Sequence, residues 1–252
     1  MGALPSKAMK PRSVRSASGP VAAVRALVDV QFRTILRDLR FALASEMQSG
    51  QRVLDLGCGE APYRSLFCEY GGGSVGLDIP SGFDMKFGSQ TALFDGSHLP
   101  IRHQSVDWVV ATEVLEHVAD LEGLLDQTVA TIRDGGFLFI TTPWSARLHY
   151  EPHDYLRPSP NLIERMLTER GLDRVWVRSR GSTASVLFNK LLITFIDNLC
   201  KPSWAFIVLP VIAPLMLVTW IVSYVSESLG LSSASDPLGF SFLYRKKSQA
   251  RT

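Results

Sequence analysis

The sequence VLDLGCG at residues 53–59 predicts a buried β-strand that ends in a glycine turn. Its three aliphatic residues suit a strand of a parallel sheet that is covered on both faces. Gly57 and Gly59 let the backbone come close to a ligand, at positions where a Cβ atom would clash. A turn of this kind between a strand and a helix predicts a pocket of the size of a nucleotide.

The residues beyond the turn narrow the choice of ligand. A second strand-like run at residues 74–77 ends at Asp78, and an acid about twenty residues past the first glycine suits the hydroxyl groups of a ribose. Pro62 stands where a dinucleotide-binding domain normally has its third glycine, and Glu60 would repel a pyrophosphate. A cationic ligand, such as a sulfonium that also carries an ammonium group, fits acids at this turn better.

Three further segments follow in order along the chain. They are FDG at residues 94–96 with Leu99 and Pro100, SVDWVVATEVLEHV at 105–118, and IRDGGFLFITTP at 132–143. Together with VLDLGCGEAPY and GLDI, they resemble the class I S-adenosylmethionine-dependent methyltransferases, with a type 11-like methyltransferase domain, over residues 51–177. The resemblance implies an α/β fold with a Rossmann-like, doubly wound, mostly parallel sheet and an antiparallel last strand. It also implies S-adenosyl-L-methionine as the cofactor and methyl transfer as the reaction.

The resemblance places the residues that bind the cofactor at the ends of the predicted strands. They are Asp55, Gly57, Cys58, Gly59, Asp78, Ile79, Asp95, Gly96 and Glu113. Asp78 would bind the ribose, and Asp55 would hold the glycine loop, reach the methionine ammonium group, or do both. Asp95 would bind the adenine amino group or, alternatively, cap the turn at Gly96.

The segment EVLEH offers groups for chemistry on an acceptor. Glu113 and His117 are four residues apart, so a helix would place them on one face, as a base or as metal ligands. The corresponding residues of the family mainly shape the floor of the pocket. We therefore predict no metal site, and we keep His117 as a candidate base.

A second candidate segment, HYEPHDYLR at residues 149–157, follows the fifth predicted strand. It resembles the H-D-Y-x-R stretch of a bacterial branch of the family that is linked with surface glycans and lipid-linked metabolites. We expect His153 to be a catalytic base that Asp154 orients. Alternatively, Asp154 pairs with Arg157 and His153 is solvated. The residues expected to contact the acceptor are Trp144, His149, Tyr155 and Arg157.

A long apolar run precedes the last predicted strand. Residues 202–226 contain no charged residue, and their length is enough to cross a membrane. However, DPLGFSFLYRKK at residues 236–247 resembles the last strand of the family's sheet. If it is that strand, a single crossing would leave it and its positive charges on the wrong side. We therefore expect residues 183–235 to form a helical hairpin, kinked at Pro210 and Pro214, that lies in one leaflet. A buried cap or the interface of a soluble dimer is the alternative.

The composition of the chain limits the partners and the cellular compartment that we expect. The chain has 252 residues and a formal net charge of +2, without the basic, aromatic-interleaved surface that nucleic acids require, so we expect no nucleic-acid partner. Three cysteines without a C-x-x-C pair suit a reducing compartment. Residues 1–20 are expected to be a disordered basic tail without a signal peptide, and residues 21–182 the methyltransferase domain, which opens with helix at 21–48.

These features together predict a methyltransferase at the cytosolic face of a membrane, monotopic or re-entrant. Its acceptor would be an oxygen atom of a lipid-linked or amphiphilic molecule, such as a glycan lipid or the head group of a quinone or isoprenoid. Membrane lipids would be partners, and a homodimer is left open. Two alternatives belong to other classes: a non-catalytic membrane-bound scaffold or cofactor-sensing module, and a soluble small-molecule methyltransferase whose insertion is a dimer interface.

Overall fold

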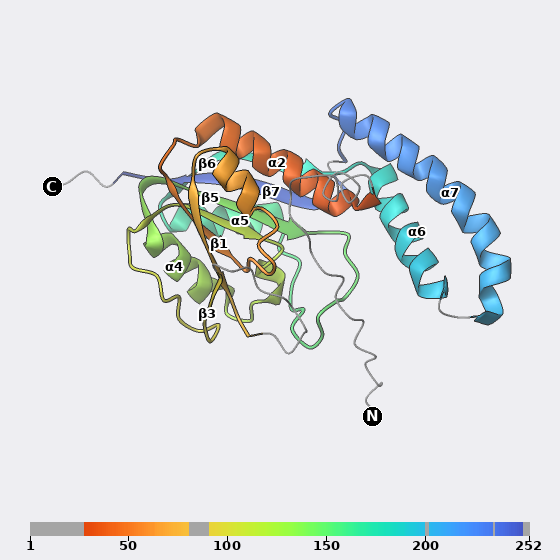
Figure 1. Ribbon diagram of the computed structural model, residues 1–252, viewed down its shortest axis with the longest axis horizontal. Helices are drawn as coiled ribbons and strands as arrows, with labels where there is room; N and C mark the ends of the chain where they lie inside the picture. The colour runs from red at the N-terminus through yellow and green to blue at the C-terminus, as the bar shows by residue number, and fades with distance from the viewer. Residues whose placement is uncertain (1–27, 81–90, 200–201, 234, 249–252) are drawn as a thin grey trace.

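Seven strands of the described residues form one mixed sheet in the order β3-β2-β1-β4-β5-β7-β6 (Figure 1). This computed structural model describes residues 28–80, 91–199, 202–233 and 235–248. The strands are β1 (Arg52–Leu56), β2 (Gly73–Asp78), β3 (Thr91–Leu93), β4 (Val106–Thr112), β5 (Ile132–Pro143), β6 (Leu172–Arg180) and β7 (Gly239–Lys246). Strands β1 to β5 pair in parallel, and β7 runs antiparallel between β5 and β6. The doubly wound sheet with an antiparallel last strand is thereby confirmed.

The winding of the sheet reverses next to β1. The chain proceeds from β1 to β2 and β3 on one side, and then crosses over to β4 on the other side of β1. Ligands of open α/β sheets bind at such a reversal, outside the carboxyl ends of the strands. Leu56 pairs with Ala111 here, so the glycine turn after β1 and the turn after β4 emerge side by side.

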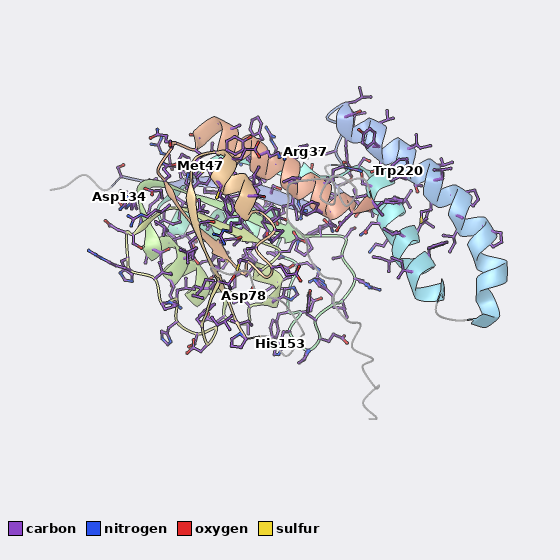
Figure 2. The ribbon with its side chains drawn as sticks, in the orientation of Figure 1. Arg37, Met47, Asp78, Asp134, His153 and Trp220 are labelled. Atoms are coloured by element: carbon purple, nitrogen blue, oxygen red, sulfur yellow. The ribbon has the colours of Figure 1, made fainter. Side chains whose placement is uncertain are left out.

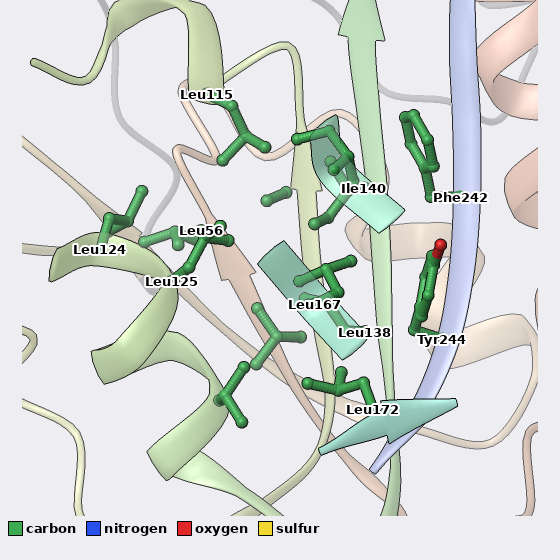
Figure 3. Packing of buried hydrophobic residues seen from close by; sticks show 14 of the residues in the cluster. Leu56, Leu115, Leu124, Leu125, Leu138, Ile140, Leu167, Leu172, Phe242 and Tyr244 are labelled. Carbon is green, nitrogen blue, oxygen red and sulfur yellow. The ribbon is translucent and has the colours of Figure 1, made fainter. Parts of the chain in front are cut away.

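Helices cover both faces of the sheet. They are α2 (Val30–Glu46) and α3 (Arg64–Glu69) on one face, and α4 (Leu121–Thr131) and α5 (Pro160–Glu169) on the other. Figure 3 shows the second of these two cores, where Leu125 of α4 lies beside Leu56 of β1 and Leu167 of α5 lies beside Leu138 of β5. The two covered faces explain why the central strands are almost continuously apolar.

The opening helix is shorter than the helical pattern of the sequence. α2 begins after Asp29, whose side chain accepts a hydrogen bond from the Phe32 amide at 3.0 Å and so caps the helix. The helix expected over residues 21–48 is confirmed between Val30 and Glu46. The expected tail at residues 1–20, and the first part of that helix, lie outside the described residues.

Two long helices lie between β6 and β7, as the apolar run predicts. α6 (Thr183–Leu199) and α7 (Pro202–Ser228) pack along each other and project from the domain as a hairpin (Figure 1). α7 is one helix that contains Pro210 and Pro214. By length and composition, Pro210–Ser228 could cross a membrane, and only 11% of this stretch is buried.

A buried polar cluster fixes the base of the hairpin to α2. Glu227 of α7 accepts hydrogen bonds from Arg33 of α2 at 2.8 Å, from Ser185 of α6 at 2.6 Å and from Ser223 at 3.1 Å. Ser185 and Ser223 are fully buried. Because an unpaired charge at this place would be costly, the cluster specifies how the hairpin meets the domain.

Candidate active site

The glycine turn after β1 leaves space beside its backbone. Gly57 and Gly59 have φ angles of 67° and 53°, a left-handed conformation that favours glycine. The Gly57 amide donates to the carbonyl oxygen of Leu77 at 2.7 Å, and a Cβ atom at Gly57 would lie 2.4 Å from a methyl group of Val114. A Cβ atom at Gly59 would meet nothing within 4 Å. Gly57 is therefore needed for packing, whereas Gly59 faces open space.

Asp78 closes this turn from the end of β2. One carboxylate oxygen accepts from the Gly59 amide at 2.6 Å and the other from the Ile79 amide at 2.7 Å. Burial raises the pKa of Asp78, and these two backbone hydrogen bonds oppose the shift. Each oxygen keeps a lone pair beyond its backbone donor, so the carboxylate can also accept from two ribose hydroxyls.

Asp55 lies beneath the turn with an unsatisfied oxygen. Its side chain is buried, and its Oδ2 atom has no hydrogen-bond partner among the described residues. Burial, with a smaller contribution from the charge of Asp78, raises the pKa of Asp55 to about 8. A buried carboxyl group without a partner suits a cationic ligand, and an ammonium group would supply the missing hydrogen bond.

Cys58 takes part through its backbone and its packing. Its sulfur lies 3.5 Å from the Thr91 hydroxyl, and burial raises the pKa of the thiol to about 12. A thiol with so high a pKa is no nucleophile at neutral pH.

The segment expected to hold adenine forms a turn closed by Asp95. The Oδ1 atom of Asp95 accepts from the amides of Ser97 at 2.8 Å and His98 at 3.2 Å, which is the turn-capping alternative. These hydrogen bonds lower the pKa of Asp95. Gly96, with φ at 83°, comes close to Ile79, since a Cβ atom there would lie 3.3 Å from the Ile79 side chain. The ends of β2 and β3 thus approach each other beside Asp78.

The expectation that Glu113 and His117 share a helix face is wrong. Glu113 has a positive φ of 54°, and the only helical turn that follows in this described stretch is a 3-10 turn, η1 (Leu115–His117). The Glu113 amide donates to the carbonyl oxygen of Thr141 at 3.1 Å, so this residue stays bound to β5 and the chain cannot continue as an α-helix.

The Glu113 carboxylate pairs with Arg180, which sequence reasoning missed. Arg180 is fully buried at the end of β6, donates to Glu113 at 2.5 Å and also donates to the carbonyl oxygen of Thr142 at 3.0 Å. The two residues are 67 positions apart. The available signal was weak: Arg180 stands immediately before Gly181, in a stretch that also contains Arg178.

His117 lies on the other side of η1. Its Nδ1 atom is 2.6 Å from the carbonyl oxygen of His153. A carbonyl oxygen only accepts, so Nδ1 carries the hydrogen and Nε2 keeps a lone pair. Burial is the main cause that lowers the pKa of His117, and the ring is therefore neutral near pH 7. This is the protonation state and tautomer of a general base.

Two neighbours could join His117 in holding an ion. Glu116 is buried, and both of its carboxylate oxygens lack a hydrogen-bond partner among the described residues. Burial and the nearby charge of Glu113 raise the pKa of Glu116 well above its ordinary value. One ligand atom each from Glu116, His117 and His149 lies within 4.8 Å of the others. The prediction of no metal site remains a prediction.

The expectation that Asp154 orients His153 is wrong, as the loop after β5 shows. Asp154 instead forms a two-pronged ion pair with Arg157 and accepts from the His149 amide at 2.9 Å. The hydrogen bond from Arg157 is the main cause that lowers the pKa of Asp154 to about 2. His153 is exposed, and its Nδ1 atom lies 2.8 Å from the Tyr155 hydroxyl. A buried carboxylate needs the charged partner more than the exposed imidazole does, so Asp154 holds the loop together.

Aromatic rings from the same loop gather beside His117. The rings of His149 and Tyr150 lie 4.8 Å and 5.2 Å from the ring of His117, both edge-on. Burial, with a smaller contribution from the charge of Asp78, raises the pKa of Tyr150. Figure 2 shows Asp78 and His153 on the same side of the domain. Trp144, at the end of β5, packs edge-on against Phe240 with 5.8 Å between the rings.

The family comparison agrees with this site. A family model for the methyltransferase domain matches residues 29–181, which is more than half of the chain. The chain therefore belongs to this family, the S-adenosylmethionine-dependent methyltransferases of class I, and S-adenosylmethionine is the cofactor of the family.

Similar proteins come from several groups of organisms. The ubiquinone biosynthesis O-methyltransferase of Rhodopseudomonas palustris is 32% identical over 105 residues, and the match covers 37% of this chain and 40% of that protein. The mitochondrial ubiquinone biosynthesis O-methyltransferase of the rat is 31% identical over 116 residues, with 40% of this chain and 33% of that protein covered. The matches thus span well under half the length of these relatives.

Solved structures with low sequence identity share the fold. A methyltransferase from Archaeoglobus fulgidus superposes with a TM-score of 0.55 at 18% identity, covering 90% of this chain and 100% of that one. Phosphoethanolamine N-methyltransferase 2 of Haemonchus contortus, solved in complex with S-adenosyl-L-methionine, superposes with a TM-score of 0.53 at 16% identity, covering 90% of this chain and 57% of that one.

Proposed function

We propose that this protein transfers a methyl group from S-adenosylmethionine to an oxygen atom of an amphiphilic acceptor at the cytosolic face of a membrane. The observation that carries the proposal is the state of His117, whose Nδ1 donates to His153 and whose Nε2 is free of a proton. A hydroxyl group loses its proton when its oxygen is methylated, and a positioned imidazole can accept that proton.

The chain's own residues divide the work between two sides of the site. Asp78 and the open space at Gly59 fit the ribose, and the unpartnered oxygen of Asp55 fits the ammonium group of the cofactor. When bound, the cofactor supplies the activated methyl group. On the acceptor side, the rings of His149 and Tyr150 make an aromatic wall beside His117, which suits a flat phenolic head group.

The relatives support oxygen as the methylated atom. The two relatives described above are ubiquinone biosynthesis O-methyltransferases, one from a bacterium and one from a mammal. A quinone precursor combines a phenolic hydroxyl with a long isoprenoid tail, and both parts fit the aromatic wall and the apolar hairpin. Among the expected acceptors we therefore favour a quinone head group over a glycan lipid.

The exposure of α7 supports placement at a membrane. Its apolar side chains are half or more exposed at Val211, Leu217 and Val218, so α7 is no core helix of a soluble domain. The interface of a soluble dimer is the alternative that remains. Flotation with vesicles distinguishes a membrane anchor from a dimer interface. A protein whose hairpin is covered by a second subunit should not float with the vesicles.

The test of the reaction uses the full-length protein in detergent, with labelled S-adenosylmethionine and two acceptors. One acceptor is a phenolic quinone precursor with an isoprenoid tail, and the other is the same head group without the tail. We expect the label on the hydroxyl oxygen and a higher kcat/KM for the tailed acceptor. Label on nitrogen or carbon would contradict the proposed atom, and equal kcat/KM values would contradict an amphiphilic acceptor.

A binding experiment distinguishes the enzyme from a non-catalytic scaffold. Asp78→Ala should remove cofactor binding in calorimetry, while the far-UV spectrum stays unchanged. If the protein is an enzyme, Asp78→Ala should abolish its function in cells. If the protein is a non-catalytic scaffold, the variant should keep that function. Unchanged affinity of Asp78→Ala for S-adenosylmethionine would overturn the site itself.

A further inference from the structure

A cavity lies at the base of the α6–α7 hairpin, away from the glycine turn. Its volume is about 510 Å³, and its walls come from α2, from the end of β6 and from the segment at the end of α7. The side chains and backbone that matter most are those of Arg37, Arg178, Ser179, Ser228, Gly230 and Ser232. In Figure 2, Arg37 lies on the opposite side of the domain from Asp78, so this cavity is separate from the active site.

The side chains that line the cavity carry a net positive charge. Arg178 makes no ion pair with the residues that the structure describes, and its guanidinium group stacks over the rings of Phe41 at 3.7 Å and Trp176 at 4.8 Å. Arg37 pairs with Asp38 at 2.9 Å through one edge, and its side chain is 40% exposed. The stacking holds the Arg178 plane in place while its N–H groups remain available to a ligand.

The one acidic side chain of the cavity wall is already neutralised. Glu227 lines the cavity but accepts hydrogen bonds from Arg33, Ser185 and Ser223, as described above. The other polar groups are serine hydroxyls, and those of Ser179 and Ser232 lie 2.9 Å apart. Guanidinium groups with hydroxyl donors around them are the usual surroundings of a bound phosphate.

Two exposed leucines that follow α7 stand next in sequence to residues that line this cavity, and we call them its apolar rim. Leu229 and Leu231 alternate with the lining residues Ser228, Gly230 and Ser232, and they are 68% and 57% exposed. If α7 is immersed as far as these leucines, the cavity lies at the depth where lipid phosphates meet water. The apolar rim argues that the phosphate is attached to an acyl chain.

We propose that this cavity binds the phosphate group of an anionic membrane lipid, with Arg178 as the principal contact. The proposal rests on the membrane placement in the proposed function, and it adds a site that the methyl-transfer reaction does not use. Lipid bound here would fix the depth and the rotation of the domain, and therefore the position of the acceptor pocket relative to the head groups.

The first experiment measures flotation of the full-length protein with two kinds of vesicle. One is made of phosphatidylcholine alone, and the other also contains phosphatidic acid. We expect the wild type to bind the second kind roughly tenfold more tightly. Arg178→Lys keeps the charge but loses the planar fork and the stacking, and it should lose most of this preference. Ser232→Asp, which adds a negative charge to the cavity, should do the same.

The control removes a positive charge from the hairpin outside the cavity. Lys190 of α6 is exposed and donates to the carbonyl oxygen of Ser145. Lys190→Gln should keep the preference for phosphatidic acid with a small general loss of binding. If Arg178→Lys retains the full preference, or if Lys190→Gln loses as much of it as Arg178→Lys, the attraction is general and the proposed site is wrong.

A second experiment tests the source of the phosphate. Calorimetry of the protein in neutral detergent compares a short-chain phosphatidic acid with inorganic phosphate. We expect binding of the lipid, lost in Arg178→Gln, and much weaker binding of phosphate. Equal affinities would assign the cavity to free phosphate and overturn the lipid. Failure of the wild type to float with any vesicle would contradict the membrane placement, whereas this calorimetry would still report on the cavity.

Discussion

His117 donates a hydrogen bond from Nδ1 to the main-chain carbonyl oxygen of His153, at 2.6 Å. This bond joins the turn after β4 to the loop after β5, and it determines which nitrogen of His117 is free. Two residues that the sequence marks as candidate bases are thus connected, and in the proposed function His117 is the base while the backbone of His153 positions it. The His153 ring itself turns away to Tyr155.

The exchange of His117 for Gln should lower kcat by at least about a hundredfold, the usual effect of losing a general base. Affinity for S-adenosylmethionine should not change, because His117 belongs to the acceptor side. Two measurements test this prediction: the turnover rate as a function of acceptor concentration, and calorimetric titration of the protein with the cofactor. His103→Gln is the matched control, since His103 is exposed and lies in the loop before β4. Comparable losses in the two variants would rule out His117 as the base.

The pH dependence of kcat follows from the same residue. Burial lowers the pKa of His117 from its ordinary value of 6.5, so the neutral ring persists to lower pH than an exposed histidine would allow. The midpoint of the acid limb of activity should therefore lie below pH 6.5. An acid limb centred above pH 6.5 would assign the base to another group.

The two glycines of the turn should respond differently to alanine. Gly59→Ala meets open space, so its cost in stability is that of a left-handed alanine, about 1 kcal/mol, but its methyl group fills the place of the cofactor. Gly57→Ala adds a clash with Val114 and should cost about 1–3 kcal/mol more. Urea unfolding and calorimetry together give the test. Normal cofactor affinity of Gly59→Ala would show that the cofactor does not approach this backbone.

Asp55→Asn should stabilise the cofactor-free protein while it weakens cofactor binding. The folded-state pKa of Asp55, about 8, lies above its ordinary value of 3.8, so the folded state holds the proton more tightly. The wild type therefore loses stability as the pH rises from about 4 to about 8, and the variant lacks this loss. The difference in unfolding free energy should grow over that window, to the order of a few kcal/mol. A difference that is independent of pH would contradict the raised pKa.

The ion pair between the fully buried Arg180 and the partly exposed Glu113 should show strong energetic coupling. Glu113→Ala leaves the buried Arg180 without its counterion, at a cost of about 3–5 kcal/mol, and Arg180→Met should cost less because water can solvate Glu113. The double variant should cost less than the sum of the single variants by more than about 1 kcal/mol. Unfolding of all four proteins in urea measures this coupling. Additive costs would mean that the pair does not hold β6 to the turn after β4.

The parts of this molecule that the sequence predicts correctly depend on short-range patterns. The strand before Gly57, the acid at the end of β2 and the strand after the apolar run are all visible in short stretches of sequence, whereas the antiparallel direction of that last strand was implied by the family resemblance. The parts that it does not predict depend on pairs far apart in the chain. Arg180 reaches Glu113 across 67 positions, and no spacing rule connects them.

Competition between partners explains the other wrong expectation. Asp154 lies next to His153 in sequence, and adjacency suggested that the two side chains work together. In the structure a guanidinium group three residues away offers two charged hydrogen bonds, and Asp154 takes these instead. Which of several nearby partners a carboxylate chooses depends on burial, and burial is a property of the fold.

The exposed face of α7 should govern binding to lipid without supporting the fold. Val218 is 57% exposed, so Val218→Glu costs little in the isolated protein but places a charge where the hairpin would enter hydrocarbon. We expect this variant to unfold at the same urea concentration as the wild type, to float poorly with phosphatidylcholine vesicles, and to methylate the tailed acceptor more slowly than the acceptor without a tail. Thr183→Glu, at the exposed start of α6 and outside the cavity, serves as the matched control, because a charge at the rim of the membrane is tolerated. If Val218→Glu instead converts a dimer to a monomer in solution and leaves flotation unchanged, the hairpin is a subunit interface.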